Sequence, residues 1–217
     1  MTVITISREF GSRGTQIAKD VAENLGYHFA DKATIAQMLS QYGYIRFGQE
    51  YDTLPGFLSR FDSQRAEMVG MLNRVILALA AHGNVVILGR GSFALLVGYV
   101  NVLNVRTQAP LAVRIRRIME QENISPIAAE TLVNENDVIR ANFIESSYKV
   151  RWDSATHFDL VIDTSKVSPE SAGNWLIETN KNLMQRSADG LPTTDEIDVQ
   201  SVLAKVVSDT LDCQATH

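Results

Sequence analysis

Apolar and polar positions follow two periods along the chain, and these periods predict strands and helices in succession. Residues 3–6 form a short β-branched apolar run, as expected of a strand buried on both faces. The next apolar side chains, Ile17, Val21 and Leu25, recur every fourth residue, and Gly26 stands where a helix would end. The chain therefore opens with a strand, a glycine-containing turn and an amphipathic helix.

Further apolar runs predict four more strands, at residues 27–30, 85–89, 100–105 and 159–164. Helical patterns lie between and after them, at residues 33–40, 63–81, 111–121, 127–150 and 168–186. Ser168 is expected to cap the last of these helices, with Pro169 at its first position. Strands that alternate with helices predict an α/β fold with a five-stranded parallel sheet covered on both faces.

Two segments fall outside this alternation. Residues 42–56 have an irregular pattern and are expected to form a loop. After residue 186 a polar segment precedes one more helical pattern, at residues 199–211. We therefore expect one domain over residues 1–187 and a helical C-terminal extension over residues 188–217. The terminal helix either docks on the core or forms the interface of a homodimer.

Composition excludes several classes of protein. The 217 residues are 45% hydrophobic and 21% charged, with a formal charge of −5, which does not favour binding to nucleic acid or to an anionic membrane. No window reaches the roughly 18 apolar residues that a membrane span needs. Cys213 is the single cysteine, so no disulfide framework or cysteine metal site is expected, which fits a cytoplasmic protein.

The turn SREFGSRG, after the first strand, carries candidate chemistry. A phosphate loop presents backbone N–H groups at a helix N-terminus, and its usual form is G-x-x-x-x-G-K-[ST]. In this register Ser7 and Ser12 replace the glycines, Arg13 replaces the lysine and Gly14 takes the hydroxyl position. Arginine also binds phosphate, so the turn predicts an atypical phosphate site. The alternative is an ordinary turn whose glycines serve only packing.

Other charged residues have open roles. Glu9, inside the turn, would repel a phosphate unless it is turned outward or engaged by an arginine or a metal. Arg90 follows a buried strand between two glycines, and this end of a parallel strand borders the ligand crevice of open α/β sheets. The alternative for Arg90 is a surface position. Trp152 is expected to be a core residue.

The predicted helices at residues 111–121 and 127–150 are rich in basic side chains. Such charges usually form a solvated face, and Asp137 could pair with Arg140 on the helix surface. The basic residues are Arg114, Arg116, Arg117, Arg140 and Lys149, with Arg151 just beyond.

The ordered set ITISREFGSRG, FADK, VVILGRGS, the basic helical region and W-D-x4-FDLVIDT resembles the cytidylate kinase-like family, a branch of the P-loop nucleoside monophosphate kinases. The resemblance spans about residues 3–184. Loops of the SREFGS type in such relatives often lack the usual lysine. The resemblance implies a three-layer α/β/α P-loop fold, with an acceptor-binding helical insertion over about residues 31–83 and a lid over about residues 112–150.

The resemblance also implies an activity: phosphoryl transfer from Mg-ATP to a nucleoside monophosphate, with CMP or dCMP the first choice. The residues that it implies for binding the donor nucleotide are Arg8, Gly11, Ser12, Arg13, Gly14, Thr15 and Thr164. It assigns the cationic clamp on the transferred phosphoryl group to Arg13, Arg114, Arg117 and Arg140. The residues that it implies for binding the acceptor nucleotide are Asp31, Lys32 and Arg90. Thr15 is the best hydroxyl for the magnesium ion, and Asp31 either orients the acceptor or caps the next helix.

Two other functions stay open. Arg13 in place of the lysine fits a nucleotide-binding regulatory protein of the same fold that has no efficient turnover. The loop at residues 42–56 carries no readable specificity, so a kinase for another small metabolite is the third hypothesis.

Overall fold

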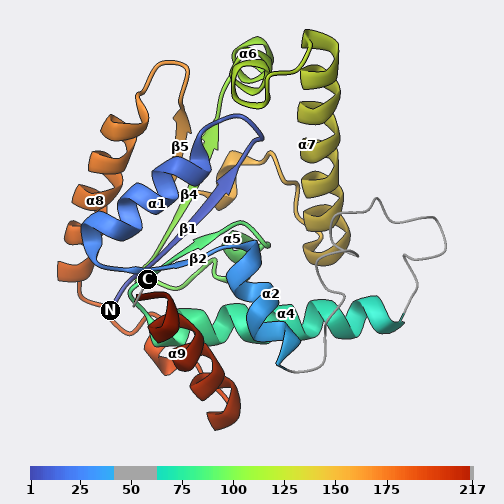
Figure 1. Cartoon of the computed structure of the whole chain (residues 1–217). Coiled ribbons are helices and arrows are strands. Elements are labelled where there is room, and N and C mark those ends of the chain that lie inside the picture. Colours follow the sequence, from blue (N-terminus) through green and yellow to red (C-terminus); the bar gives the residue numbers. More distant parts are fainter. Residues whose placement is uncertain (42–62, 216–217) are drawn as a thin grey trace.

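The computed structural model describes residues 1–41 and 63–215, so the predicted loop at residues 42–56 lies outside the described residues. Its strands are β1 (Val3–Arg8), β2 (His28–Ala30), β3 (Val85–Leu88), β4 (Val102–Gln108) and β5 (Leu160–Asp163). They form one parallel sheet in the order β2-β3-β1-β4-β5 (Figure 1). The predicted five-stranded parallel sheet is confirmed.

The helices are α1 (Gly14–Leu25), α2 (Lys32–Ser40), α4 (Ser63–His82), α5 (Ser92–Leu95), α6 (Leu111–Glu122), α7 (Pro126–Tyr148), α8 (Pro169–Gln185) and α9 (Ser201–Ala215). Short 3-10 turns lie at Ala155–His157 and Thr194–Glu196. The Ser168 hydroxyl caps α8 by accepting from the Ser171 amide, as predicted. The short helix α5 was not predicted. No helix in the described part of the chain is long and apolar enough to cross a membrane.

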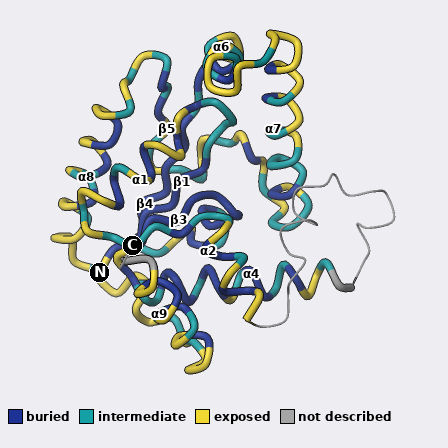
Figure 2. The backbone as a smooth tube through the Cα atoms, viewed as in Figure 1, coloured by how far each residue is buried: buried dark blue, intermediate teal, exposed yellow. Residues whose placement is uncertain are grey.

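Side chains on alternate strand positions enter two separate cores. Ile4 and Ile6 of β1 belong to the cluster that packs against α1 and α8. Val3, one position earlier, faces the opposite cluster, which α2, α4 and α9 complete. Figure 2 shows the strands as a buried layer between these helices. This two-residue alternation is what a sheet covered on both faces requires.

The α9 helix belongs to the second of these layers. Leu203, Val207 and Leu211 are buried against the core that contains α4. In this chain α9 thus covers the core, whereas a homodimer stays a prediction.

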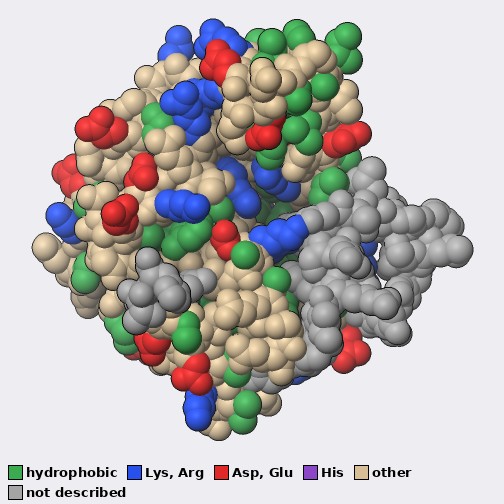
Figure 3. All heavy atoms as spheres, in the orientation of Figure 1, with side chains coloured by type: hydrophobic (Ala, Val, Ile, Leu, Met, Phe, Trp, Pro, Cys, Tyr) green, Lys and Arg blue, Asp and Glu red, His purple; other side chains and the backbone are tan. Residues whose placement is uncertain are grey.

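The α6 and α7 helices stand beside the carboxyl ends of the strands (Figure 1). They share a small apolar cluster of their own, centred on Ile118, Ala129 and Val133. The far end of α7 instead places Phe143 and Ile144 in the main core beside α4. Below α6 and α7, Lys and Arg side chains gather around a hollow in the surface (Figure 3).

Candidate functional site

The turn from β1 to α1 is tied to itself and to β4. The Ser12 hydroxyl is buried, donates to the Glu9 carbonyl at 2.8 Å and lies 3.0 Å from the Thr107 hydroxyl. The Ser12 amide donates to the same Glu9 carbonyl at 3.2 Å. The Ser12 side chain is therefore used inside the turn and holds its shape.

Gly14 begins α1 at a point where no side chain fits. An added Cβ would collide with the Thr107 hydroxyl and lie 2.6 Å from the Arg8 Cβ. The hydroxyl residue of the usual phosphate-loop pattern therefore has no room at this position. Thr15, the next residue, is exposed.

Arg13 is the N-cap of α1 and has a left-handed backbone, with φ of 61°. A non-glycine residue in this region carries strain, which proteins tend to retain at functional sites. The N–H groups of the first helical turn have no acceptor within the helix and form its positive end. The exposed Arg13 side chain adds a full positive charge at this helix terminus, which suits it to an anion.

A cavity of about 660 Å³ opens over this helix terminus. The turn and the start of α1 form one wall, and α6 and α7 form the other. Four arginines line it, namely Arg8, Arg13, Arg117 and Arg140. Because they converge from four different segments on one helix N-terminus, the cavity is suited to a ligand that carries several negative charges.

Arg117 links the turn to the end of β5. Its guanidinium donates to the Gly11 carbonyl at 3.2 Å, to the Thr164 hydroxyl at 3.0 Å and to the Thr164 carbonyl at 2.6 Å. The buried Thr164 hydroxyl in turn donates to the Ser12 carbonyl at 2.9 Å. Burial, followed by the positive charge of Arg13, lowers the pKa of Arg117. Thr164 thus supports the turn from beneath and does not line the cavity.

Arg140 reaches the turn from α7. Its guanidinium donates to the Arg8 carbonyl at 3.0 Å and lies over the Phe10 ring, 5.4 Å from the ring centroid. Asp137 Oδ1 is 3.8 Å away. The Arg140 guanidinium is therefore held by the Arg8 carbonyl and by the face of the Phe10 ring, and Arg140 lines the cavity.

Arg114 does not line the cavity, although it is only one helical turn from Arg117. Its buried guanidinium donates to the Ala109 carbonyl at 2.9 Å and to the Phe10 carbonyl at 3.1 Å, and it pairs with the Asp137 carboxylate. All of these partners belong to the protein. In this structure Arg114 supports the turn from below, and a direct contact with a ligand stays a prediction.

The role of Glu9, open in the sequence, is that of a counter-charge. Its carboxylate lies 3.3 Å from the Arg114 Nε and 3.4 Å from the Arg106 Nη2, and it accepts from the Ala109 amide at 3.0 Å. Arg106 is buried, stacks on the ring of Trp152 at 4.5 Å, and has a pKa lowered by burial. Glu9 is thus engaged by two arginines, and their positive charges offset the repulsion that its carboxylate would exert on a phosphate.

Phe10 joins the turn to the apolar cluster of α6 and α7, and the sequence reasoning missed it. Its ring packs against the cluster of Ile118 and Val133. Its amide donates to the Asp137 carboxylate at 2.8 Å. The only hint in the sequence was a large aromatic residue in a turn of small and polar ones. Side chain and backbone of Phe10 together fix the turn to the two helices.

The Gly89-Arg90-Gly91 turn lies at the same edge of the sheet, after β3. The Arg8 guanidinium lies against Gly89, where an added Cβ would collide with it. Arg90 is buried, at 5% exposure, and has a left-handed backbone with φ of 59°. The Tyr148 ring fills the space beside Gly91, where a Cβ would also collide. The structure thus brings the Arg8 guanidinium to the turn that contains Arg90.

Asp31 caps α2. Its carboxylate accepts from the Ala33 amide at 2.8 Å and from the Thr34 amide at 3.1 Å. Lys32 is the first residue of that helix. The cap is the structural alternative noted from the sequence, and acceptor binding by Asp31 and Lys32 stays a prediction.

Known proteins resemble the chain over most of its length. A cytidylate kinase of Methanocaldococcus jannaschii is 29% identical over 191 residues, 87% of this chain and 98% of that protein. A cytidylate kinase of Ignicoccus hospitalis is 29% identical over 185 residues, 85% and 99% of the two chains. The solved structure of an uncharacterised Eubacterium ventriosum protein shares the fold, with a TM-score of 0.67 at 20% identity, covering 86% of this chain and all of its own. The model of the cytidylate kinase-like family matches residues 3–166, and the chain therefore belongs to this family of nucleoside monophosphate kinase-like phosphotransferases.

Proposed function

We propose that the protein transfers the γ-phosphoryl group of Mg-ATP to a nucleoside monophosphate, with CMP or dCMP as the acceptor. The observation that carries the proposal is the convergence of Arg8, Arg13, Arg117 and Arg140 around one cavity at the N-terminus of α1. The choice of cytidylate as acceptor is supported by relatives that bear the name cytidylate kinase.

Phosphoryl transfer needs positioning and neutralisation of charge more than it needs covalent chemistry from the protein. The amides of the first turn of α1 would hold the donor phosphates. Arg13 and Arg117 would neutralise charge on the transferred group from the two walls of the cavity. Magnesium, carried by the nucleotide, would neutralise further phosphate charge, and Thr15, whose exposed side chain lines the cavity, is proposed to meet it.

On the acceptor side, Arg90 is proposed to hold the phosphate of the nucleoside monophosphate. Arg90 follows Gly89, which lies against the guanidinium of Arg8, and Arg8 lines the cavity proposed for the donor. A phosphate oxygen of the acceptor would attack the γ-phosphorus, and the bond to the bridging oxygen of ADP would break. The attacking oxygen is already anionic, so no strong general base is required.

A coupled assay for ADP formation over a panel of nucleoside monophosphates tests the proposal. We expect turnover with CMP or dCMP. Replacing Arg117 with Ala should lower kcat/KM by about 100-fold, because the cavity loses a cation and the turn loses its link to Thr164. The matched variant is Arg116→Ala, since Arg116 is exposed and does not line the cavity; its kcat/KM should stay within about twofold of wild type. ATP binding with no turnover on any acceptor would contradict the proposal.

The second candidate is a nucleotide-binding regulatory protein without efficient turnover. The Phe10 amide favours it, because this N–H of the turn is bonded to the Asp137 carboxylate. A turn that offers fewer free amides to the donor phosphates would still bind the nucleotide, but it would stabilise the transition state poorly. The same assay separates the two functions, and other phosphorylated or hydroxylated acceptors in the panel test for a kinase of another small metabolite.

A further inference from the structure

Asp137, in the middle of α7, reaches the turn between β1 and α1. Its Oδ1 accepts from the Phe10 amide at 2.8 Å, and its Oδ2 pairs with the Arg114 guanidinium. The sequence favours a surface pair of Asp137 with Arg140, but that guanidinium lies 3.8 Å away, and the Asp137 side chain is only 17% exposed. The carboxylate is therefore directed at the turn rather than at solvent.

Arg114 completes a bracket around Phe10. The guanidinium that pairs with Asp137 also donates to the Phe10 carbonyl at 3.1 Å, while its Nε donates to the Ala109 carbonyl at 2.9 Å. The N–H of Phe10 is thus bound by Asp137, and its C=O is bound by the arginine that Asp137 holds. One ion pair fixes both backbone polar groups of Phe10.

The peptide unit that joins Phe10 to Gly11 is oriented as a consequence. In a planar trans peptide the C=O and the N–H point in opposite directions, so the Gly11 N–H points away from Arg114. Gly11 lines the donor cavity, whereas Arg114 does not. Among the residues that the structure describes, the Gly11 N–H has no acceptor. A backbone donor of this kind, in a cavity lined by arginines, is available to an anion.

Gly11 is also the point of closest approach between the turn and α6. Its backbone is left-handed, with φ of 80°, and an added Cβ would lie 3.1 Å from the Cβ and from the carbonyl oxygen of Arg114. Glycine permits both the conformation and the contact. A displacement of Arg114 would therefore be transmitted directly to the peptide unit that carries the Gly11 N–H.

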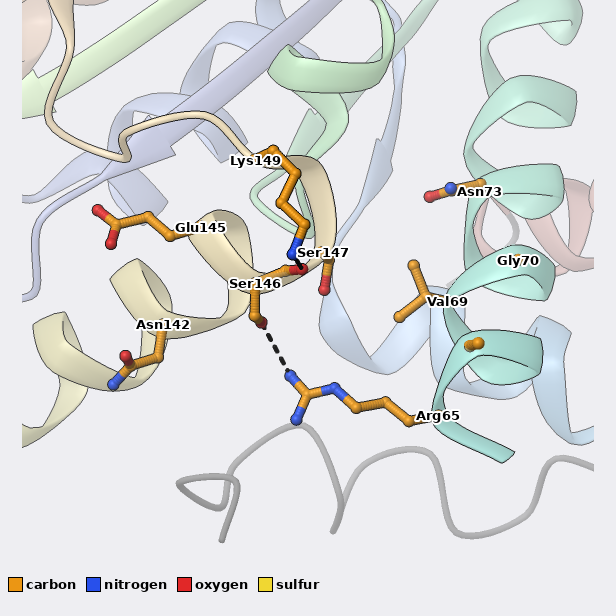
Figure 4. Close-up of a pocket in the computed structure, with 10 residues that line it drawn as sticks. Arg65, Val69, Gly70, Asn73, Asn142, Glu145, Ser146, Ser147 and Lys149 are labelled. Atoms are coloured by element: carbon orange, nitrogen blue, oxygen red, sulfur yellow. Dashed lines mark hydrogen bonds between the residues drawn. The ribbon is translucent and has the colours of Figure 1, made fainter. Parts of the chain in front are cut away.

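The α7 helix holds Asp137 in place relative to the core. The last turns of α7 enter the main core beside α4. Figure 4 shows this end of the helix, where the Arg65 guanidinium of α4 donates to the Ser146 hydroxyl at 3.1 Å. Because α7 is tied to α4 in this way, the Asp137 carboxylate reaches the turn from a helix that is fixed at its far end.

We propose that Asp137 is a positioning residue of the phosphate site: through Arg114 and the Phe10 amide it aims the Gly11 N–H at the phosphates of the donor. The proposal rests on the kinase function proposed above. The turn gives up the amide of Phe10 to α7 and gains a fixed amide at Gly11.

The charge that develops during the reaction decides which kinetic constant should respond. As the bond from the γ-phosphorus to the bridging oxygen of ADP breaks, negative charge grows on the leaving phosphate. A donor that is already aimed at this phosphate stabilises the transition state more than it stabilises bound ATP. Loss of Asp137 should therefore lower kcat more than it raises the KM for ATP.

Two variants of Asp137 test this split. Asp137→Ala should lower kcat by about 10- to 100-fold and change the KM for ATP by less than about threefold. Asp137→Asn keeps an acceptor for the Phe10 amide but removes the charge that holds Arg114, so its kcat should fall less, by about three- to tenfold. The asparagine variant carries the same test if the alanine variant does not fold.

Ser125→Ala is the matched control on the same helix. Ser125 caps α7 by accepting from the Ala128 amide at 3.3 Å, and it does not line the donor cavity. Its loss should lower the Tm by about 2–4 °C and leave kcat unchanged at temperatures well below the Tm. If Asp137→Ala behaves in the same way, with a lower Tm and a wild-type kcat, the positioning role is overturned.

The amide resonance of Gly11 in NMR spectra of the labelled protein gives a measurement that does not depend on turnover. Mg-ATP should shift this amide proton downfield in wild type, and the shift should fall to about half or less in Asp137→Ala. No shift in wild type, or equal shifts in the two proteins, would overturn the role of Asp137 even if CMP is phosphorylated. A shift that the variant reduces, without turnover on any acceptor, would support Asp137 while the kinase function fails.

Discussion

The Thr107 hydroxyl on β4 occupies the space that a side chain on Gly14 would need. The departure from the usual phosphate-loop pattern at this position is therefore a packing requirement of this fold. A hydroxyl residue at position 14 would have to displace both Thr107 and the Arg8 side chain.

Gly14→Ser restores the residue type of the usual pattern, and we expect it to damage the protein. The new Cβ would collide with Thr107 and lie 2.6 Å from the Arg8 Cβ, which should lower the free energy of unfolding by about 1–3 kcal/mol. Denaturant unfolding measures the loss, and a nucleotide titration should show weaker ATP binding. Thr15→Ser, at an exposed position, is the control and should leave stability unchanged. Wild-type stability in Gly14→Ser would contradict the close packing.

Arg13→Gly should separate stability from nucleotide binding. Glycine adopts the left-handed backbone without strain, so the free energy of unfolding should be unchanged or raised by up to about 1 kcal/mol. Loss of the cation should weaken ATP binding by about tenfold, measured by calorimetry. Asp189→Gly is the matched control, since Asp189 has a φ of 49° and does not line the donor cavity. Unchanged ATP affinity in Arg13→Gly would remove Arg13 from the phosphate site.

Glu9→Gln should destabilise the protein although it preserves the shape of the side chain. Arg106 and Arg114 are buried and would lose a shared counter-charge, at a cost of about 2–3 kcal/mol in the free energy of unfolding. The comparison is Asp153→Asn, which breaks an exposed ion pair with Arg151 and should leave the Tm nearly unchanged. Equal Tm values for the two variants would mean that Glu9 is not a structural counter-charge.

His28 should make stability depend on pH. Burial, and to a smaller extent the charge of His82, holds the pKa of His28 below its usual value of 6.5. The imidazole of His28 therefore binds a proton more readily in the unfolded chain than in the folded one. The free energy of unfolding is consequently highest above about pH 6.5, and part of it is lost as the pH falls below that value. Melting curves between pH 8 and pH 5 should show the loss, and His28→Gln should flatten it. An unchanged slope in the variant would assign the effect to other groups.

The sequence predicted the sheet well and its polar ends poorly. β4 continues to Gln108, three residues past the predicted strand, because Arg106 and Thr107 pair with β1 although they are polar. Arg106 can be buried in this strand because Glu9 and Trp152 accompany it from distant parts of the chain. Such partners cannot be identified from the local pattern.

The same limit applies to the arginines of α6. Arg114 and Arg117 lie three positions apart on one helix, and periodicity alone places both near the turn. Only the tertiary positions of Glu9 and Asp137 direct Arg114 beneath the turn, while Arg117 lines the cavity. Likewise, the need for Gly14 depends on Thr107, which is 93 residues away.

The Phe10 ring has a consequence for motion. The ring sits in the apolar cluster of α6 and α7 while the Phe10 backbone belongs to the turn, so outward motion of these helices is coupled to the turn. They must either expose the ring to water, at a cost of about 1–2 kcal/mol for a half-buried phenyl group, or carry the turn with them. Motion without the turn would also break the bonds that Arg114, Arg117 and Arg140 donate to its carbonyls, so the turn and the two helices are expected to move as one unit.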